Sequence, residues 1–210
     1  MHAQATAQRQ RRSFWLKTLH QWHWVSAALC LIGLILFALT GITLNHASQI
    51  KTTPQVVSLK ATLPEPLRAA LAAAPLEGTA PLPETLSEWL RAEWSLHSAQ
   101  REAEWSADEV YLSLPRPGGD GWLSVDRATG EMEYEQTDRG WISYFNDLHK
   151  GRNAGPMWGW FIDLFALACL VFAITGLFLL KLHAVQRAMT WPVVGLGLVI
   201  PLLLALLFVH

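Results

Sequence analysis

Three long apolar stretches constrain the fold of this 210-residue chain more than any other feature. They are Val25–Leu44, Trp158–Leu180 and Trp191–Val209, and Asp163 is the one charged residue within them. A helix of roughly 20 apolar residues crosses the roughly 30 Å hydrocarbon core of a bilayer. The first stretch is longer than the apolar core of a secretory signal peptide and runs on into His46, so we expect it to be retained. The sequence therefore predicts three transmembrane helices.

The distribution of charge predicts the orientation of these helices. Basic residues without any acidic ones precede the first stretch and follow the second; they are Arg9, Arg11, Arg12, Lys17, Lys181 and Arg187. Residues 46–157 instead carry 10 Lys or Arg and 16 Asp or Glu, a net charge of −6 (10 − 16). Because basic loops stay on the cytoplasmic side, we expect a cytoplasmic N-terminus and an outward-facing 46–157 region. The C-terminal His210 is then expected on the outer side.

The region between the first two stretches has the pattern of a small α+β module. A helix is predicted from Pro64 to just before Pro75, and apolar residues recur at helical spacing over Thr85–Trp105. A period of two follows, which predicts three strands at Val110–Leu114, Gly121–Val125 and Glu131–Glu135. We find no Ser/His/Asp or Cys/His arrangement of the catalytic kind in this module.

Four short motifs and one hairpin carry a resemblance to a known family. The motifs are Leu19-His20-Gln21-Trp22, Leu39-Thr40-Gly41, Asp147-Leu148-His149 and Ile174-Thr175-Gly176-Leu177, and the hairpin turns at Val125–Glu131. Over residues 14–183 this ordered set resembles the PepSY-associated transmembrane family, and the hairpin resembles that of PepSY domains. Relatives include ferric-siderophore reductases that bind b-type haem through histidines. The resemblance implies a bacterial inner-membrane protein with one or two haem b groups.

Together, the apolar stretches, the charges and the resemblance predict six segments. They are a cytoplasmic basic N-terminus at 1–20, transmembrane helix 1 at 21–46, a periplasmic PepSY-like domain at 47–148, an interfacial segment with transmembrane helix 2 at 149–183, a cytoplasmic loop at 184–190 and transmembrane helix 3 at 191–210. The expected fold is thus a mainly α membrane protein with a small α+β domain inserted between helices 1 and 2.

Five of the eight histidines lie at the edges of the apolar stretches. The predicted topology places His46 with His149 on the outer side, and His20 or His23 with His183 on the inner side. Two imidazoles can hold haem iron in a six-coordinate state suited to electron transfer, so these residues are the candidate ligands. The alternative for each position is an interfacial histidine without a ligand. Because His20 and His46 are 26 residues apart, about 39 Å along a helix, we expect two separate sites.

Two acidic residues are candidates for supporting roles. Asp147 could orient a histidine ring through a hydrogen bond. Asp163 lies within a membrane stretch, where a carboxylate is costly and often functional. It could partner a ligand, accept a proton or form a polar contact between helices.

The leading functional hypothesis is a haem protein in electron transfer, with a possible role as a ferric-siderophore reductase in iron uptake. No Gly-rich phosphate loop or dinucleotide fingerprint is present, so electrons are expected from quinol or from another redox protein. No basic patch suggests nucleic acid as a partner.

Two alternatives stay open. One is a non-enzymatic PepSY module that binds a protein or peptide at a strand edge near Tyr111 or Tyr134. The other is an accessory protein that binds a transition metal directly.

Overall fold

The computed structural model describes residues 2–73, 77–98, 101–184 and 187–209. The chain divides into two compact units. The first unit comprises Met1–Ile35 and Phe161–His210, and the second comprises Leu36–Trp160.

Three helices in the described part of the chain are long and apolar enough to cross a membrane. They lie within α1 (His2–Asn45), α5 (Pro156–His183) and α6 (Thr190–Phe208). The prediction of three transmembrane helices is therefore confirmed, and the chain is a multi-pass membrane protein. Helix α1 begins at His2, well before the apolar stretch, because the basic N-terminal segment holds no Gly or Pro to interrupt it.

Small residues allow close packing of α1 against α5 within the first unit. A Cβ atom on Gly33 would lie only 2.3 Å from Cε2 of Phe165, so the Phe165 ring packs directly on the α1 backbone. Cys30 is fully buried and Ser26 is nearly so. The Ser26 hydroxyl donates to the Trp22 carbonyl oxygen of its own helix, 2.7 Å away. Packing of this kind through small residues is a common basis of helix association in membranes.

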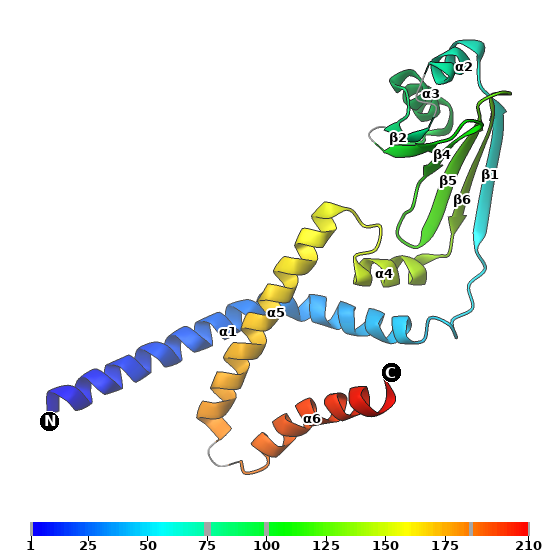
Figure 1. The fold of residues 1–210 in the computed structure, drawn as a ribbon. Helices are drawn as coiled ribbons and strands as arrows, with labels where there is room; N and C mark the ends of the chain where they lie inside the picture. The colour runs from blue at the N-terminus through cyan, green and yellow to red at the C-terminus, as the bar shows by residue number, and fades with distance from the viewer. Residues whose placement is uncertain (1, 74–76, 99–100, 185–186, 210) are drawn as a thin grey trace. The chain divides into compact units, whose positions relative to one another are not determined.

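The second unit is built around a six-stranded antiparallel sheet with the order β1-β6-β5-β4-β3-β2 (Figure 1). Its strands are β1 (Gln55–Thr62), β2 (Gly78–Pro81), β3 (Glu102–Trp105), β4 (Glu109–Ser113), β5 (Gly119–Asp126) and β6 (Glu131–Asp138). Three helices accompany the sheet: α2 (Glu65–Ala72), α3 (Glu84–Trp94) and α4 (Trp141–Lys150).

The core of this unit lies between one face of the sheet and the helices α2 and α3. Leu71, Leu86 and Leu90 of the helices meet Leu112 and Leu123 of the strands, and all five are buried. Alternate residues of β4 and β5 are buried, as expected for a sheet with one packed face and one open face. The predicted α+β class is confirmed.

Several elements differ from the sequence-based predictions. Helix α3 stops at Trp94 rather than Trp105, because Ser95 adopts a left-handed conformation with φ of 53°. The following Glu102–Trp105 alternates exposed and buried residues and forms β3 instead. Strands β1 and β2 and helix α4 were not predicted.

The predicted positions of the free sheet edges are wrong. Tyr111 lies in β4 and Tyr134 in β6, and both strands are hydrogen-bonded on their two sides. Among the described strands, the edges are β1 and β2.

Candidate functional site

Helix α4 carries three neighbouring polar residues that each bind a different part of the second unit. The Asn146 Oδ1 accepts a hydrogen bond from the Thr43 hydroxyl at 2.7 Å. The Asp147 Oδ2 accepts one from the Gly118 N–H at 2.9 Å. Among the described residues, Asp147 thus binds the turn before β5 and no histidine ring, which differs from the orienting role expected of it.

The third residue, His149, is held against α1. Its Nδ1 lies 2.7 Å from the Thr40 hydroxyl oxygen. The Phe37 ring packs against the imidazole with 4.9 Å between ring centroids. A Cβ on Gly41 would lie 3.6 Å from His149 Cε1, so this glycine also borders the ring. The imidazole is half-buried, and we call this group of four residues the His149 site.

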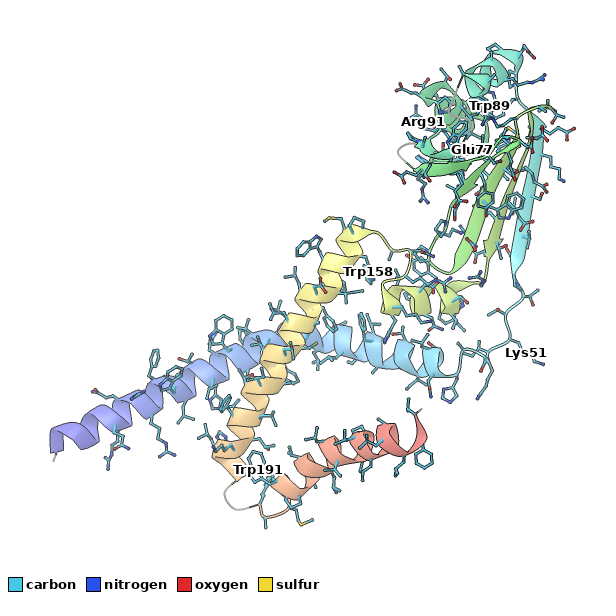
Figure 2. All side chains as sticks on the ribbon, viewed as in Figure 1. Lys51, Glu77, Trp89, Arg91, Trp158 and Trp191 are labelled. Carbon is cyan, nitrogen blue, oxygen red and sulfur yellow. The ribbon has the colours of Figure 1, made fainter. Side chains whose placement is uncertain are left out.

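The chain just after His149 is anchored as well. The indole N–H of Trp158, labelled in Figure 2, donates to the Leu148 carbonyl oxygen at 2.8 Å. This bond ties the beginning of α5 to the end of α4.

A second histidine has the same surroundings in the first unit. His23 Nδ1 lies 3.1 Å from the Thr175 hydroxyl oxygen and 3.2 Å from the Phe172 carbonyl oxygen. Its ring stacks on Phe172, with centroids 4.7 Å apart. A Cβ on Gly176 would lie 3.2 Å from His23 Cε1. The ring is half-buried, and these four residues form the His23 site.

The two sites share a repeated pentapeptide. Residues 37–41 read Phe-Ala-Leu-Thr-Gly and residues 172–176 read Phe-Ala-Ile-Thr-Gly. Positions one, four and five of the pentapeptide share one helix face, which explains why each Phe, Thr and Gly meets one imidazole. The Thr-Gly pairs were predicted as family motifs, but the repeat of the whole pentapeptide was not predicted. A comparison of the two apolar stretches with each other would have found it.

The remaining candidate ligands are exposed at the helix ends. Nδ1 of each bonds the backbone carbonyl four residues earlier: His20 to Leu16 at 2.8 Å, His46 to Ile42 at 3.0 Å and His183 to Leu179 at 2.8 Å. The structure brings two of them together, since the rings of His20 and His183 meet edge to face with centroids 5.7 Å apart. Among the described residues, no hydrogen bond or ring contact joins His46 to His149.

These contacts define which imidazole nitrogen carries the proton. A carbonyl oxygen only accepts hydrogen bonds, so Nδ1 is an N–H donor in His20, His23, His46 and His183. Nε2 is then the basic nitrogen of a neutral ring, which is the form that binds a metal or accepts a proton.

The family of the chain follows from comparison with known proteins. A family model described as PepSY_TM-like matches residues 14–210, which include both pentapeptides and all five candidate histidines. The chain belongs to the PepSY_TM-like family. The family resemblance noted in the sequence is therefore confirmed. No curated protein and no solved structure matches the chain.

Asp163 of this PepSY_TM-like protein lies on an exposed face of α5. It makes no hydrogen bond or ion pair with any residue that the structure describes. The structure therefore does not bring it to a histidine site.

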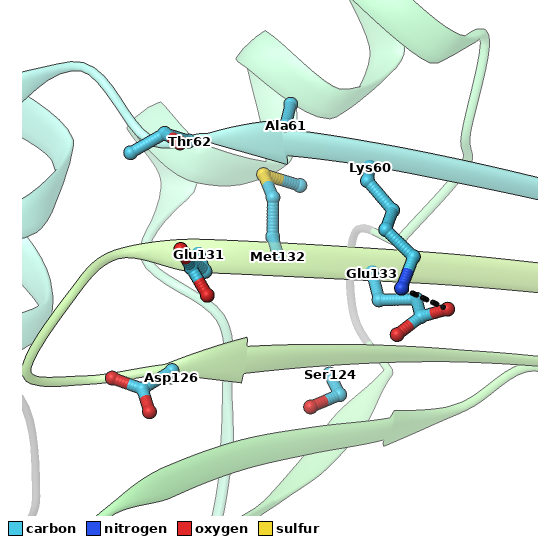
Figure 3. A pocket seen from close by; sticks show the side chains of 8 residues that line it. All are labelled: Lys60, Ala61, Thr62, Ser124, Asp126, Glu131, Met132 and Glu133. Atoms are coloured by element: carbon cyan, nitrogen blue, oxygen red, sulfur yellow. Dashed lines mark ion pairs between the residues drawn. The ribbon is translucent and has the colours of Figure 1, made fainter.

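The open face of the sheet in the PepSY_TM-like protein holds a shallow depression of about 470 Å³ (Figure 3). Lys60 pairs with Glu133 there at 3.1 Å, while Asp126 binds the backbone of its own turn. Within the described ranges of the chain, no group of three or more His, Cys, Asp or Glu side chains is placed to hold a metal ion.

Proposed function

We propose that this PepSY_TM-like protein is a b-type haem protein that transfers electrons in the bacterial inner membrane. One observation carries the proposal: the half-buried His149 and His23 are both held through Nδ1 by a second helix, which leaves Nε2 without a partner among the described residues. A neutral imidazole with a free Nε2 is the usual axial ligand of haem iron in electron-transfer proteins. The donor set therefore fits this cofactor.

The proposed ligands fall into an outer and an inner group. His149 would hold haem on the outer side, with His46 as the candidate second ligand. His23, His20 and His183 are the candidates on the inner side. When bound, haem supplies an iron centre that takes up and releases one electron.

Other residues of the chain have defined roles in this proposal. Phe37 and Phe172 pack against one side of the imidazoles and shield that side from solvent. An open depression of about 620 Å³ beside His20 is lined by Lys17 and Trp24. The Lys17 ammonium could pair with a carboxylate of a bound ligand, such as a haem propionate.

The donor and the acceptor are proposed from sequence and charge. The chain has no dinucleotide fingerprint, which supports quinol or a redox protein as the electron donor. Basic residues are in excess at the N-terminus and at 181–190, which supports a cytoplasmic location for these two segments. The sheet domain and the C-terminus are then proposed to lie in the periplasm. A ferric siderophore in the periplasm is the proposed acceptor, which makes ferric reduction the proposed activity.

The test is a reduced-minus-oxidised visible spectrum of protein purified from cells supplied with haem precursor. We expect a low-spin b-type spectrum from the wild-type protein. His149→Ala should lose the haem signal of the outer site, and His23→Ala should lose that of the inner site. His97→Ala is the matched control, because His97 is exposed in the loop after α3. The variants His20→Ala, His46→Ala and His183→Ala identify the second ligands. Protein that shows no haem spectrum despite adequate supply overturns the proposal.

A second candidate function is binding of a peptide or protein partner by the sheet domain. The observation that favours it is the free edge of β1, where Val56 and Val57 are 56% and 51% exposed. An added strand could pair with such an edge. If this is the function, Val57→Lys impairs it and His149→Ala does not. Direct binding of a transition metal, the third candidate, is tested by metal analysis of haem-free protein.

A further inference from the structure

We infer that Thr40 and Thr175 are positioning residues that fix the tautomer and orientation of His149 and His23. Each threonine hydroxyl has a single proton to donate. The Thr40 hydroxyl donates to its own helix, with its oxygen 2.9 Å from the Leu36 carbonyl and 3.1 Å from the Phe37 carbonyl. A hydroxyl has one proton to donate and two lone pairs to accept with. Towards His149, the Thr40 oxygen is therefore the acceptor.

The Thr175 hydroxyl has the same bonds in the other site. Its oxygen lies 2.6 Å from the Val171 carbonyl and 3.1 Å from the Phe172 carbonyl. Here an independent contact identifies the donor, since His23 Nδ1 also lies 3.2 Å from the Phe172 carbonyl oxygen, which can only accept. Nδ1 of His23 therefore carries the proton, and Thr175 accepts from it.

The two sites use the two long helices in opposite roles. In the His23 site, α1 carries the histidine and α5 carries the pentapeptide. In the His149 site, α1 carries the pentapeptide, and the histidine lies at the end of α4, just before α5. The same three contacts, from Phe, Thr and Gly, recur at both histidines although the two helices exchange roles. The pentapeptide is therefore a repeated structural motif that holds an imidazole. A chance contact would not recur in this way.

Among the described residues, Thr40 is the polar group that contacts the His149 ring, whereas the His23 ring contacts both the Thr175 hydroxyl and the Phe172 carbonyl oxygen. The Phe ring and the Gly backbone border each imidazole without distinguishing its two nitrogens. Removing the Thr40 hydroxyl therefore removes the group that favours the Nδ1–H tautomer of His149, and removing the Thr175 hydroxyl removes one of the two groups that favour it in His23. For a ring that binds a metal through Nε2, a hydrogen bond at Nδ1 also raises the basicity of the ligand, and loss of such a partner typically costs 10–100-fold in affinity.

The primary experiment uses haem-free protein, so it does not depend on the proposed function. Protein labelled with 15N in its histidine rings is reconstituted in lipid, and the ring nitrogens are observed by solid-state NMR. The variants His149→Gln and His23→Gln assign the two signals. We expect both wild-type rings to be protonated at Nδ1 and unprotonated at Nε2.

The threonine variants then test the inference. Thr40→Val should shift His149 towards a mixture of tautomers and leave His23 unchanged. Thr175→Val should leave His149 unchanged and shift His23 to a smaller extent, because the Phe172 carbonyl oxygen still accepts from its Nδ1. Thr40→Ser keeps the hydroxyl and should restore the wild-type signal. Thr43→Val is the matched control, because it removes a hydrogen bond from α1 to Asn146 without touching His149. Unchanged His149 signals in Thr40→Val, or an equal change in Thr43→Val, overturn the inference.

A second readout rests on the proposed function. If haem binds, Thr40→Val should weaken binding at the His149 site by 10–100-fold and Thr40→Ser should recover it. Wild-type affinity in Thr40→Val contradicts the role of the hydroxyl at the metal. Protein without haem refutes the proposed function alone, because the tautomer measurement still decides the inference. If Thr40→Val does not fold, the Thr175→Val variant and the serine variants carry the same test.

Discussion

The buried carboxylate of Asp147 accepts a hydrogen bond from the backbone N–H of Gly118, with 2.9 Å between nitrogen and Oδ2. This bond ties α4 to the turn that leads into β5. Two residues later on α4, His149 is bound to Thr40 of α1. One short helix therefore connects the sheet to a candidate ligand histidine within the second unit.

Removal of the Asp147 carboxylate should destabilise the sheet domain. The side chain is buried, so Asp147→Ala leaves the Gly118 N–H without its partner in a site closed to water. An unsatisfied buried donor costs about 1–3 kcal/mol, and we expect a loss of that size in thermal unfolding followed by circular dichroism. Asp108→Asn, at an exposed position, is the control. Equal stability of the two variants would show that the bond contributes nothing.

Gly118 should not tolerate a side chain. Its φ is +71°, and an added Cβ would lie 2.6 Å from the Tyr144 Cα. Gly118→Ala must therefore displace the α4 backbone as well as adopt a left-handed conformation. Gly155→Ala has a similar φ of +79° with no atom within 4 Å of the added Cβ. We expect about 1–2 kcal/mol of destabilisation from the left-handed conformation in Gly155→Ala and clearly more in Gly118→Ala. Similar unfolding temperatures would contradict the close approach of α4.

The two pentapeptide glycines should differ in their tolerance of alanine. A Cβ at position 176 would lie 3.2 Å from His23 Cε1, a tight contact, whereas one at position 41 would lie 3.6 Å from His149 Cε1, an ordinary contact. Gly176→Ala should therefore displace the His23 ring and alter its 15N signals. Gly41→Ala should leave the His149 signals near their wild-type positions. The reverse order of effects would contradict the tighter packing of the His23 ring against Gly176.

Acid should weaken the turn between β5 and β6 through Asp126. The Thr129 N–H and hydroxyl, with the Ala128 N–H, donate to this carboxylate and lower its pKa below the ordinary value. Because the folded-state pKa is lowered, the stabilisation is present above the unfolded pKa of about 3.9 and is lost as pH falls through the folded value. Asp126→Asn keeps an acceptor oxygen but has no charge to titrate. The difference in unfolding temperature between wild type and Asp126→Asn should therefore shrink with acid, and a constant difference would refute this.

Some strands and helices of the sheet domain could be predicted from the sequence and others could not, depending on whether the signal of each segment is local. The β5–β6 hairpin was predictable because its alternation and its turn residues are local. Strand β1 was not, because prolines flank it on both sides (Pro54, Pro64 and Pro66) and its partner β6 lies far along the chain, with Ser58 opposite Glu135. Helix α4 had a local signal that went unused, since Gly140 precedes it and Gly151 follows it with a left-handed φ of 67°.

The sequence by itself determined the class of the protein, its three membrane helices and the set of candidate histidines. Apolar length, charge and motif order are properties of contiguous residues, so they can be read without coordinates. Only the tertiary structure distinguished among the histidines. His23 and His149 are half-buried and bound to a second helix, while His20, His46 and His183 are exposed and bound through Nδ1 to their own backbone. The physical reason is that the partner threonines lie 152 and 109 positions away, and helix rotation and packing decide which ring each hydroxyl meets.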